Sequence, residues 1–136
     1  NRGMGMFNGF LLGNCMEITL PTRPFQHIDS EDGEIALCIL GAINLGKCKS
    51  DSDLEKACDL LVRSLDALID YQDYPVKCAE ISTKARRSLG IGVIGLAHYF
   101  AKLGVSYDSQ AAWDASHKRF ESVQYYLLKA SNQFQF

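Results

Sequence analysis

The chain has 136 residues, of which 47% are hydrophobic and 22% charged, and its formal net charge is −2. This length suits one domain with a sizeable core, and the composition is that of a folded chain. The weak charge, with basic residues clustered only at Lys84, Arg86 and Arg87, gives no reason to expect binding to nucleic acid or to an anionic membrane. No apolar stretch approaches the roughly 20 residues that a membrane span requires.

The five cysteines are an odd number and include no C-x-x-C pair. This pattern lacks the spacing of a metal site and argues against a secreted disulfide framework. No convincing signal-peptide cleavage site follows the N-terminus. We therefore expect a reduced protein of the cytoplasm (the host cytoplasm if it is viral) with no bound metal. The cysteines are Cys15, Cys38, Cys48, Cys58 and Cys78.

In chain order, residues 1–13 have no clean period and are predicted to be an irregular tail. Residues 15–20 predict a short strand that ends at Pro21, and residues 21–33 have the Pro, Gly and acidic residues of a loop. Residues 34–46 form a buried apolar run. It is either a strand that passes into a turn or a short helix, since periodicity does not separate the two.

A helix is predicted from Ser52, because Ser52 and Glu55 have the spacing of a capping box. It should stop near Tyr74, since Pro75 disfavours helical geometry in the residue before it. Its apolar stripe is expected to be Leu54, Cys58, Leu61, Leu65 and Leu68.

A short basic segment follows, and then Leu89–Ile94 predicts a buried strand. Gly95–Leu103 is predicted to be helical and to end at Gly104 in a left-handed cap. A last helix is expected from about Ser109 to the end of the chain. Its stripe, which we expect to be core or an interface, is Trp113, Ser116, Phe120, Val123, Leu127, Ala130 and Phe134.

Cys15 and Glu17 are the strongest candidates for reactive side chains in this chain. In an extended segment, side chains two positions apart leave the same face, so both could reach one small substrate. Spacing alone favours a core cysteine beside a surface glutamate, because buried free cysteines are common.

The wider sequence changes this balance. The run from Cys15 to Thr22 closely resembles the active-site loop of the large (α) subunit of class I ribonucleotide reductases. About nine tenths of the chain carries further motifs of that family in family order. They are Gly33–Cys38, Asn44–Gly46, Leu65–Pro75, Arg87–Val93 and Tyr125–Ser131.

The resemblance implies a role for three residues. Cys15 matches the cysteine that becomes a thiyl radical and abstracts the hydrogen at C3′ of the ribose. Glu17 matches the carboxylate that takes the proton of the 3′-hydroxyl. Cys38 matches one of two cysteines that supply the reducing electrons and end as a disulfide.

The chain departs from the family just before Cys15. The family has Asn-x-Cys-x-Glu, with the asparagine holding the ribose, whereas Gly13 stands at that position here and Asn14 directly precedes the cysteine. Asn14 is a weak substrate-binding candidate, because an alternating strand would point it away from Cys15 and Glu17. The cysteine that pairs with Cys38 in the family lies upstream of this chain.

As a whole, the resemblance implies an α/β fold that is part of a ten-stranded barrel and is rich in helix. Residues 14–136 would be a partial barrel domain after a non-family tail. The function implied is reduction of ribonucleoside diphosphates for DNA synthesis. It would require the remaining large-subunit segments, a radical-generating small subunit and thioredoxin or glutaredoxin as reductant.

The cofactors of the family, a metal-radical centre in the small subunit and ATP or dATP effectors in the N-terminal region, are not expected to bind this segment. The chain has no initiator Met and stops inside a helical pattern, so we expect one part of a larger unit. A single part would leave apolar faces such as the Trp113–Phe134 stripe exposed.

Other interpretations remain open. The chain could be an inactive assembly or regulatory fragment of the same fold. Residues 1–13 suggest a split gene or an intein junction at Asn14–Cys15, although inteins usually have His in place of Gly13. Gly90–Gly95 reads G-x-G-x-x-G, but the polar segment before it does not suit a dinucleotide-binding strand, so we expect these glycines to serve close packing.

Overall fold

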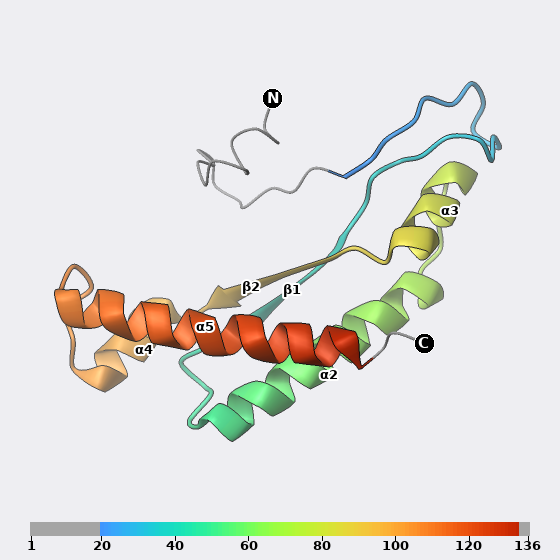
Figure 1. Ribbon diagram of the computed structural model, residues 1–136. Coiled ribbons are helices and arrows are strands. Elements are labelled where there is room, and N and C mark those ends of the chain that lie inside the picture. Colours follow the sequence, from blue (N-terminus) through green and yellow to red (C-terminus); the bar gives the residue numbers. More distant parts are fainter. Residues whose placement is uncertain (1–19, 134–136) are drawn as a thin grey trace. The chain divides into compact units, whose positions relative to one another are not determined.

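The computed structural model of the protein describes residues 20–133 (Figure 1). The chain divides into two compact units. One contains the residues up to Leu37 together with Asp73–Arg86, and the other contains Cys38–Gln72 and the residues from Arg87 onward. The predicted strand at residues 15–20 lies outside the described residues except for Leu20, which is in no helix or strand.

The described residues form a mixed α/β structure that is mostly helical, as predicted. The elements in chain order are β1 (Ile39–Asn44), α2 (Asp51–Tyr71), α3 (Lys77–Arg86), β2 (Leu89–Ile94), α4 (Leu96–Leu103) and α5 (Gln110–Asn132).

The first unit consists of the predicted loop and α3. The backbones of Arg23 and Glu34 exchange two hydrogen bonds, of 3.1 and 2.9 Å, which fold the loop back on itself. The Ser82 hydroxyl then donates to the Ile35 carbonyl over 2.7 Å and ties α3 to the segment after the loop.

Helix α3 was not predicted. Its buried face consists of small residues, Cys78, Ala79, Ser82 and Thr83, so it carries no large apolar stripe for a sequence pattern to reveal. A helical signal was nevertheless present in the charges. Glu80 pairs with Lys77 at 3.2 Å and with Lys84 at 2.8 Å, at the i,i+3 and i,i+4 spacings that helices favour.

The second unit is built on two parallel strands. β1 and β2 pair in the register Ile39↔Leu89 to Asn44↔Ile94, and α2 lies in the crossover between them. The run at residues 34–46 is therefore a strand followed by a turn, closed by the Lys47 amide donating to the Asn44 carbonyl. The alternative of a short helix is wrong. The strand Leu89–Ile94 is confirmed at both ends, but none of its residues is fully buried, so the prediction of a buried strand is wrong.

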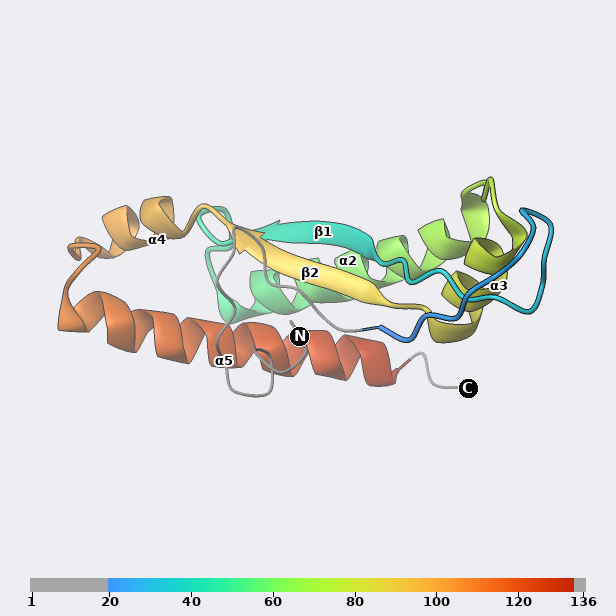
Figure 2. The same cartoon turned by 90° about the horizontal axis from the view of Figure 1, so that it is seen from above.

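The core of this unit lies where α2 packs on the strands and α5 lies beside α2 (Figures 1 and 2). One sheet face carries Ile43, which is buried, whereas Leu40 and Ile94 remain 73% and 54% exposed. The central buried cluster is Ile43, Leu45, Leu54, Cys58 and Val123.

The capping residue of helix α2 lies two positions earlier than predicted. Ser50 is the N-cap: its hydroxyl accepts from the Asp53 amide at 3.1 Å, and the Asp53 carboxylate accepts from the Ser50 amide. The proposed Ser52–Glu55 box is therefore wrong. The helix ends at Tyr71, three residues before the predicted stop at Tyr74.

The predicted stripe of α2 was correct at three positions. Leu54, Cys58 and Leu65 are buried, but Val62 and Ile69 complete the buried face. Leu61 is only partly buried and Leu68 is 44% exposed. The packed face is therefore rotated slightly from the one that large apolar residues alone suggested.

Helices α4 and α5 confirm the predictions for their starts and for the cap of α4. Gly104 adopts a left-handed φ of 68°, and Ser109 caps α5 by accepting from the Ala112 amide. In the α5 stripe, Val123 and Ala130 are buried, whereas Trp113 and Phe120 are 61% and 41% exposed. Phe134 lies outside the described residues.

Candidate functional site

Of the predicted site residues, the structure describes only Cys38. Cys15, Glu17 and the weaker candidate Asn14 lie outside residues 20–133, so the predicted grouping of Cys15 with Glu17 is not tested by the structure. Cys38 is a half-buried free thiol that directly precedes β1.

Strand β2 determines the position of Cys38. The amide of Ile39, the next residue, donates to the Ser88 carbonyl over 3.1 Å. Across the sheet lies Gly90, and a Cβ atom placed there would be 3.8 Å from the Cys38 sulfur. A side chain at Gly90 would therefore touch the thiol, which places Cys38 near the start of β2.

Gly90 also serves close strand packing, as predicted. A Cβ atom on Gly90 would lie 2.5 Å from Cδ2 of Leu40 on the neighbouring strand. Gly90 and Gly92 are inside β2, and helix α3 rather than a strand precedes them. A dinucleotide-binding turn needs its glycines between a strand and a helix, so the G-x-G-x-x-G match does not have that geometry.

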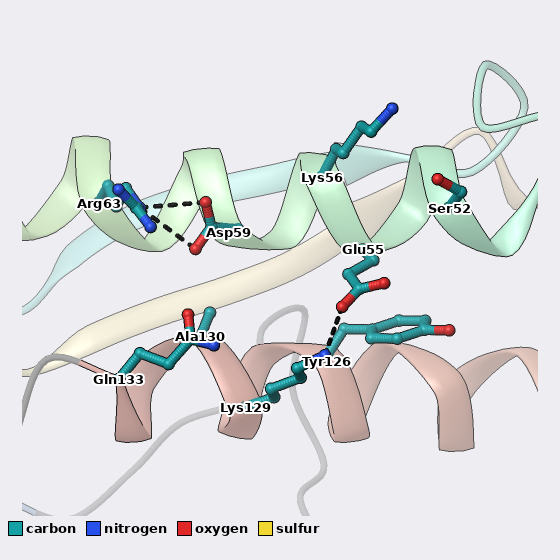
Figure 3. Close-up of a pocket in the computed structure, with 9 residues that line it drawn as sticks. All are labelled: Ser52, Glu55, Lys56, Asp59, Arg63, Tyr126, Lys129, Ala130 and Gln133. Carbon is teal, nitrogen blue, oxygen red and sulfur yellow. Dashed lines mark hydrogen bonds and ion pairs between the residues drawn. The ribbon is translucent and has the colours of Figure 1, made fainter.

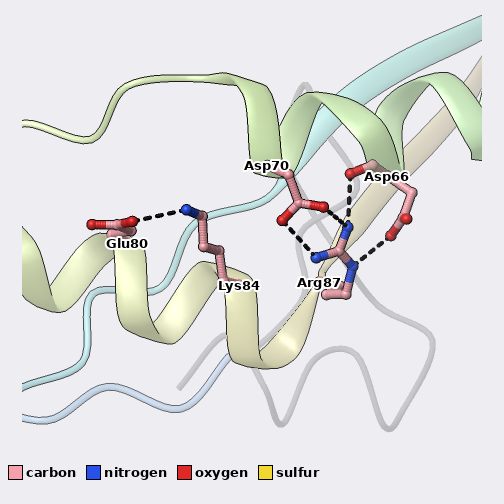
Figure 4. A network of polar contacts seen from close by, with 5 residues as sticks. All are labelled: Asp66, Asp70, Glu80, Lys84 and Arg87. Atoms are coloured by element: carbon pink, nitrogen blue, oxygen red, sulfur yellow. Dashed lines mark hydrogen bonds and ion pairs between the residues drawn. The ribbon is translucent and has the colours of Figure 1, made fainter.

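Arg87, two residues before the start of β2, makes an extensive set of ionic contacts (Figure 4). Its Nε donates to Asp66 Oδ1 at 2.6 Å, and its Nη1 and Nη2 form a bidentate pair with Asp70 at 3.0 and 2.8 Å. Nη2 also donates to the Asp66 carbonyl at 2.9 Å. Hydrogen bonds to Asp70 and then Asp66 raise the pKa of Arg87 above its ordinary value.

This set of contacts, Arg87 with Asp66 and Asp70, is called the Arg87 clamp below. Arg87 is the one non-glycine residue with positive φ, 48°, in the described part of the chain. A left-handed conformation is unfavourable for a residue with a side chain, so the surrounding contacts must hold it. The clamp fixes the point at which the chain enters β2.

The basic residues Lys84, Arg86 and Arg87 each have a carboxylate partner. Lys84 pairs with Glu80, Arg86 pairs with Glu34 at 2.7 Å, and Arg87 forms the clamp. These charges are largely neutralised within the chain, which disfavours a phosphate site there.

The other cysteines within residues 20–133 have structural roles. Cys58 and Cys78 are fully buried, and the Cys48 thiol donates to the Asn44 carbonyl at 3.5 Å. Burial, with a smaller contribution from Cys48, raises the pKa of Cys58 to about 11, although Arg119 opposes the shift. A thiol that stays protonated is a poor nucleophile, so Cys58 is not a candidate for redox chemistry.

An open groove of about 320 Å³ lies between α2 and α5 (Figure 3). Its charges are mostly paired: Arg63 contacts Asp59 at 3.0 Å and Lys129 contacts Glu55 at 2.6 Å. No cysteine of residues 20–133 lines this groove. Its lining residues are Ser52, Glu55, Lys56, Asp59, Arg63, Tyr126, Lys129, Ala130 and Gln133.

Residues 20–133 contain no group of three or more His, Cys, Asp or Glu side chains arranged to hold a metal ion. None of the helices described is long and apolar enough to cross a membrane.

Sequence analysis did not find the Arg87 clamp, although part of its signal was present. Asp66 and Asp70 are four residues apart, so on a helix they lie on one face and can share a cation. The identity of that cation depends on where β2 packs, which no local pattern reveals.

Comparison with known proteins identifies the family of the chain. Residues 13–135 match the family described as ribonucleotide reductase, barrel domain. The chain is 62% identical over 117 residues to the ribonucleoside-diphosphate reductase subunit alpha of Haemophilus influenzae, covering 86% of this chain and 16% of that protein. It is 53% identical over 119 residues to the ribonucleoside-diphosphate reductase 1 subunit alpha of Escherichia coli strain K12, covering 88% of this chain and 16% of that protein.

A viral relative is similar over the same extent. The subunit alpha of Enterobacteria phage T4 is 43% identical over 119 residues, covering 86% of this chain and 15% of the phage protein. The chain therefore spans about a sixth of the length of the curated relatives that it matches.

Proposed function

Because the chain belongs to the ribonucleotide reductase barrel-domain family, we propose that it supplies the active-site loop and one reducing thiol of a ribonucleoside-diphosphate reductase. The observation that carries the proposal is the 62% identity to a reductase alpha subunit over 86% of the chain. The free, half-buried state of Cys38 supports it further, since a reducing thiol has to be unpaired and within reach.

The proposed chemistry uses three residues. The Cys15 thiyl radical takes the hydrogen atom from C3′ of a ribonucleoside diphosphate, and Glu17 takes the proton of the 3′-hydroxyl. Cys38 and a second thiol outside this chain together supply two electrons and two protons: one proton leaves with the 2′-hydroxyl as water, and the other becomes the new hydrogen on C2′. The two sulfurs end as a disulfide that an external dithiol protein reduces, and Cys15 returns the hydrogen atom to C3′.

The domain boundary, partners and location are proposed with this function. Residues 14–136 form the barrel part after a non-family tail of residues 1–13. The activity requires the remaining large-subunit segments, the small subunit and a thioredoxin- or glutaredoxin-type reductant, in the cytoplasm or host cytoplasm. The relatives' length supports the need for further segments, because this chain covers only 16% of the Haemophilus protein.

The test is reduction of a nucleoside diphosphate by this chain combined with the other large-subunit segments and the small subunit. We expect Cys15→Ser to abolish turnover and Glu17→Gln to lower kcat by about 100-fold, the usual contribution of a general base. Cys38→Ser should remove turnover with the dithiol reductant. The matched control is Cys48→Ser, another half-buried free cysteine, which should keep wild-type turnover.

Two outcomes would contradict the proposal. Turnover that is unaffected by Cys15→Ser would remove the radical role. Assembly into a complex without any turnover would favour an inactive assembly or regulatory fragment of the same fold.

A further inference from the structure

We propose that Arg87 is a positioning residue for Cys38, acting through the first residues of β2. This inference rests on the proposed function, because it concerns the thiol that supplies electrons. Arg87 does not contact the sulfur itself. It holds the piece of backbone to which Ile39, the residue after Cys38, is hydrogen-bonded.

The first step of the argument is the anchoring of Arg87 on α2. Four hydrogen bonds of 2.6 to 3.0 Å join its guanidinium to Asp66 and Asp70. The side chains of Arg87 and Asp66 are only 34% and 32% exposed. The bidentate pair with Asp70 has a fixed geometry, although Asp70 itself is 59% exposed. Partial burial protects the pair with Asp66 from screening by salt.

The second step is the path from Arg87 to Cys38. Ser88 follows Arg87 directly, and its carbonyl accepts the amide of Ile39, which follows Cys38 directly. This bond is the one that begins the pairing of β1 with β2, ahead of the Ile39↔Leu89 pair. The clamp and the thiol are therefore joined by one hydrogen bond and two short stretches of backbone.

The third step is the conformation at Arg87. Its φ of 48° lies in the left-handed region, where glycine would be the natural residue. An arginine at this strained position is explained by side-chain contacts that a glycine could not make. The clamp therefore turns the chain into β2 in one defined direction.

The position of Cys38 matters because it and a second thiol have to end as a disulfide when they reduce the substrate. A disulfide forms only where the two Cβ atoms come within about 3.5 to 4.5 Å of each other. A reacting group misplaced by about 1 Å can lose about 100-fold in rate. Loosening the start of β2 should therefore slow the step in which Cys38 is oxidised, without changing substrate binding.

The experiment compares four variants in the assembled reductase. Arg87→Gly removes the clamp but suits the left-handed backbone, so it keeps the turn. Arg87→Lys keeps the charge but cannot reach both carboxylates in the bidentate geometry. Asp66→Asn weakens the clamp from the α2 side. The matched control is Lys129→Gln, which breaks the Lys129–Glu55 pair between α5 and α2 and leaves β2 alone.

Four quantities are measured: kcat and KM for the nucleoside diphosphate, the rate of hydrogen exchange of the Ile39 amide, and the rate of Cys38 alkylation by iodoacetamide. For Arg87→Gly we expect kcat to fall by about tenfold with KM within about twofold, the signature of a lost positioning effect. Ile39 exchange and Cys38 alkylation should both become faster by about tenfold, since the Ser88 bond opens more often. Arg87→Lys and Asp66→Asn should be intermediate, and Lys129→Gln should match the wild type.

The inference is overturned if Arg87→Gly leaves Ile39 exchange and Cys38 alkylation at wild-type rates, whatever happens to kcat. A fall in kcat that Lys129→Gln reproduces would also overturn it, because the effect would then be general destabilisation. Cys38→Ser separates the two proposals. If that variant keeps full turnover, the role of Cys38 is wrong, and the exchange and alkylation rates still decide whether Arg87 holds this strand.

Discussion

Cys58 illustrates how burial alone determines the chemistry of a side chain. It lies on α2 within the central apolar cluster, and its side chain is fully buried. The same cluster holds the half-buried Cys48 next to it. The pKa of Cys58 is raised from 9.0 to about 11, mainly because the thiolate would lose its hydration.

This shift predicts a loss of stability in alkali. A thiol whose pKa is higher in the folded protein than in the unfolded chain favours folding while it is protonated. Its contribution is complete below pH 9.0 and is lost as the pH rises through about 11. At about 1.36 kcal/mol per pKa unit, the free energy of unfolding should fall by about 2 to 3 kcal/mol through this group.

Urea unfolding measured from about pH 8 to about pH 11 tests this expectation. Cys58→Ala should remove this part of the pH dependence, while Cys78→Ala, which also replaces a fully buried cysteine, should retain it. Equal slopes for Cys58→Ala and the wild type would show that Cys58 does not titrate in this range.

At the scale of the element, the start of α2 depends on two reciprocal hydrogen bonds. The Ser50 hydroxyl accepts from the Asp53 amide, and the Asp53 carboxylate accepts from the Ser50 amide. Two amide groups that the helix cannot satisfy internally are thereby bonded. The carboxylates of Asp51 and Asp53 in the first turn also interact favourably with the helix dipole.

We therefore expect Ser50→Ala to lower the free energy of unfolding by about 1 kcal/mol, the usual cost of losing an N-cap. Thermal or urea unfolding provides the measurement. Ser52→Ala is the matched control, because Ser52 is an exposed serine in the first turn and should change stability by less than about 0.5 kcal/mol. The reverse order of effects would restore the capping box first predicted at Ser52 and Glu55.

The elements differ in how far sequence could predict them. β2 and α4 were predictable because an apolar run and a terminal glycine, Gly104, are local signals. The cap of α2 was misplaced because Ser50 and Ser52 have acidic residues at the same spacing, and local chemistry does not choose between them. α3 was missed because its buried face is made of small residues.

The candidate site shows the same limit. The apolar neighbours of Cys38 left a strand and a short helix open, and the structure shows that it directly precedes strand β1. Its proximity to Gly90 and the hydrogen bond from Ile39 to Ser88 depend on parallel pairing of distant segments. The Arg87 clamp joins residues 17 and 21 positions apart, so it exists only once α2 and β2 have packed together.

At the scale of the whole molecule, α5 keeps an exposed apolar face. Trp113 and Leu128 are 61% and 59% exposed, while Val123 and Ala130 on the same helix are buried in the second unit. The predicted Trp113–Phe134 stripe is thus exposed at Trp113 but buried at Val123 and Ala130, so the expectation that it is exposed holds only in part. Large exposed apolar side chains gathered on one element are typical of a surface that meets another part of a protein.

Trp113 provides a direct probe, because it is the single tryptophan of the chain. If the remaining large-subunit segments cover α5, the emission of Trp113 should shift to shorter wavelength when this chain is mixed with them. Leu128→Lys on the same helix should weaken the association, whereas Leu60→Lys, an exposed leucine of α2, serves as the matched control. An emission maximum that does not move on assembly would show that this face stays in water.

The parallel pairing of β1 with β2 has a consequence for synthesis of the chain. Ile39 meets Leu89, fifty positions later, so β1 leaves the ribosome long before its partner exists. At translation rates of about 5 to 20 residues per second, the delay is roughly 3 to 10 seconds. During that time α2, whose contacts are local, can form and cover the face of β1 that carries Ile43. The edge of β1 that later pairs with β2 stays open to neighbouring nascent chains. Until β2 is synthesised, the unpaired edge of β1 is thus a binding site suited to a chaperone.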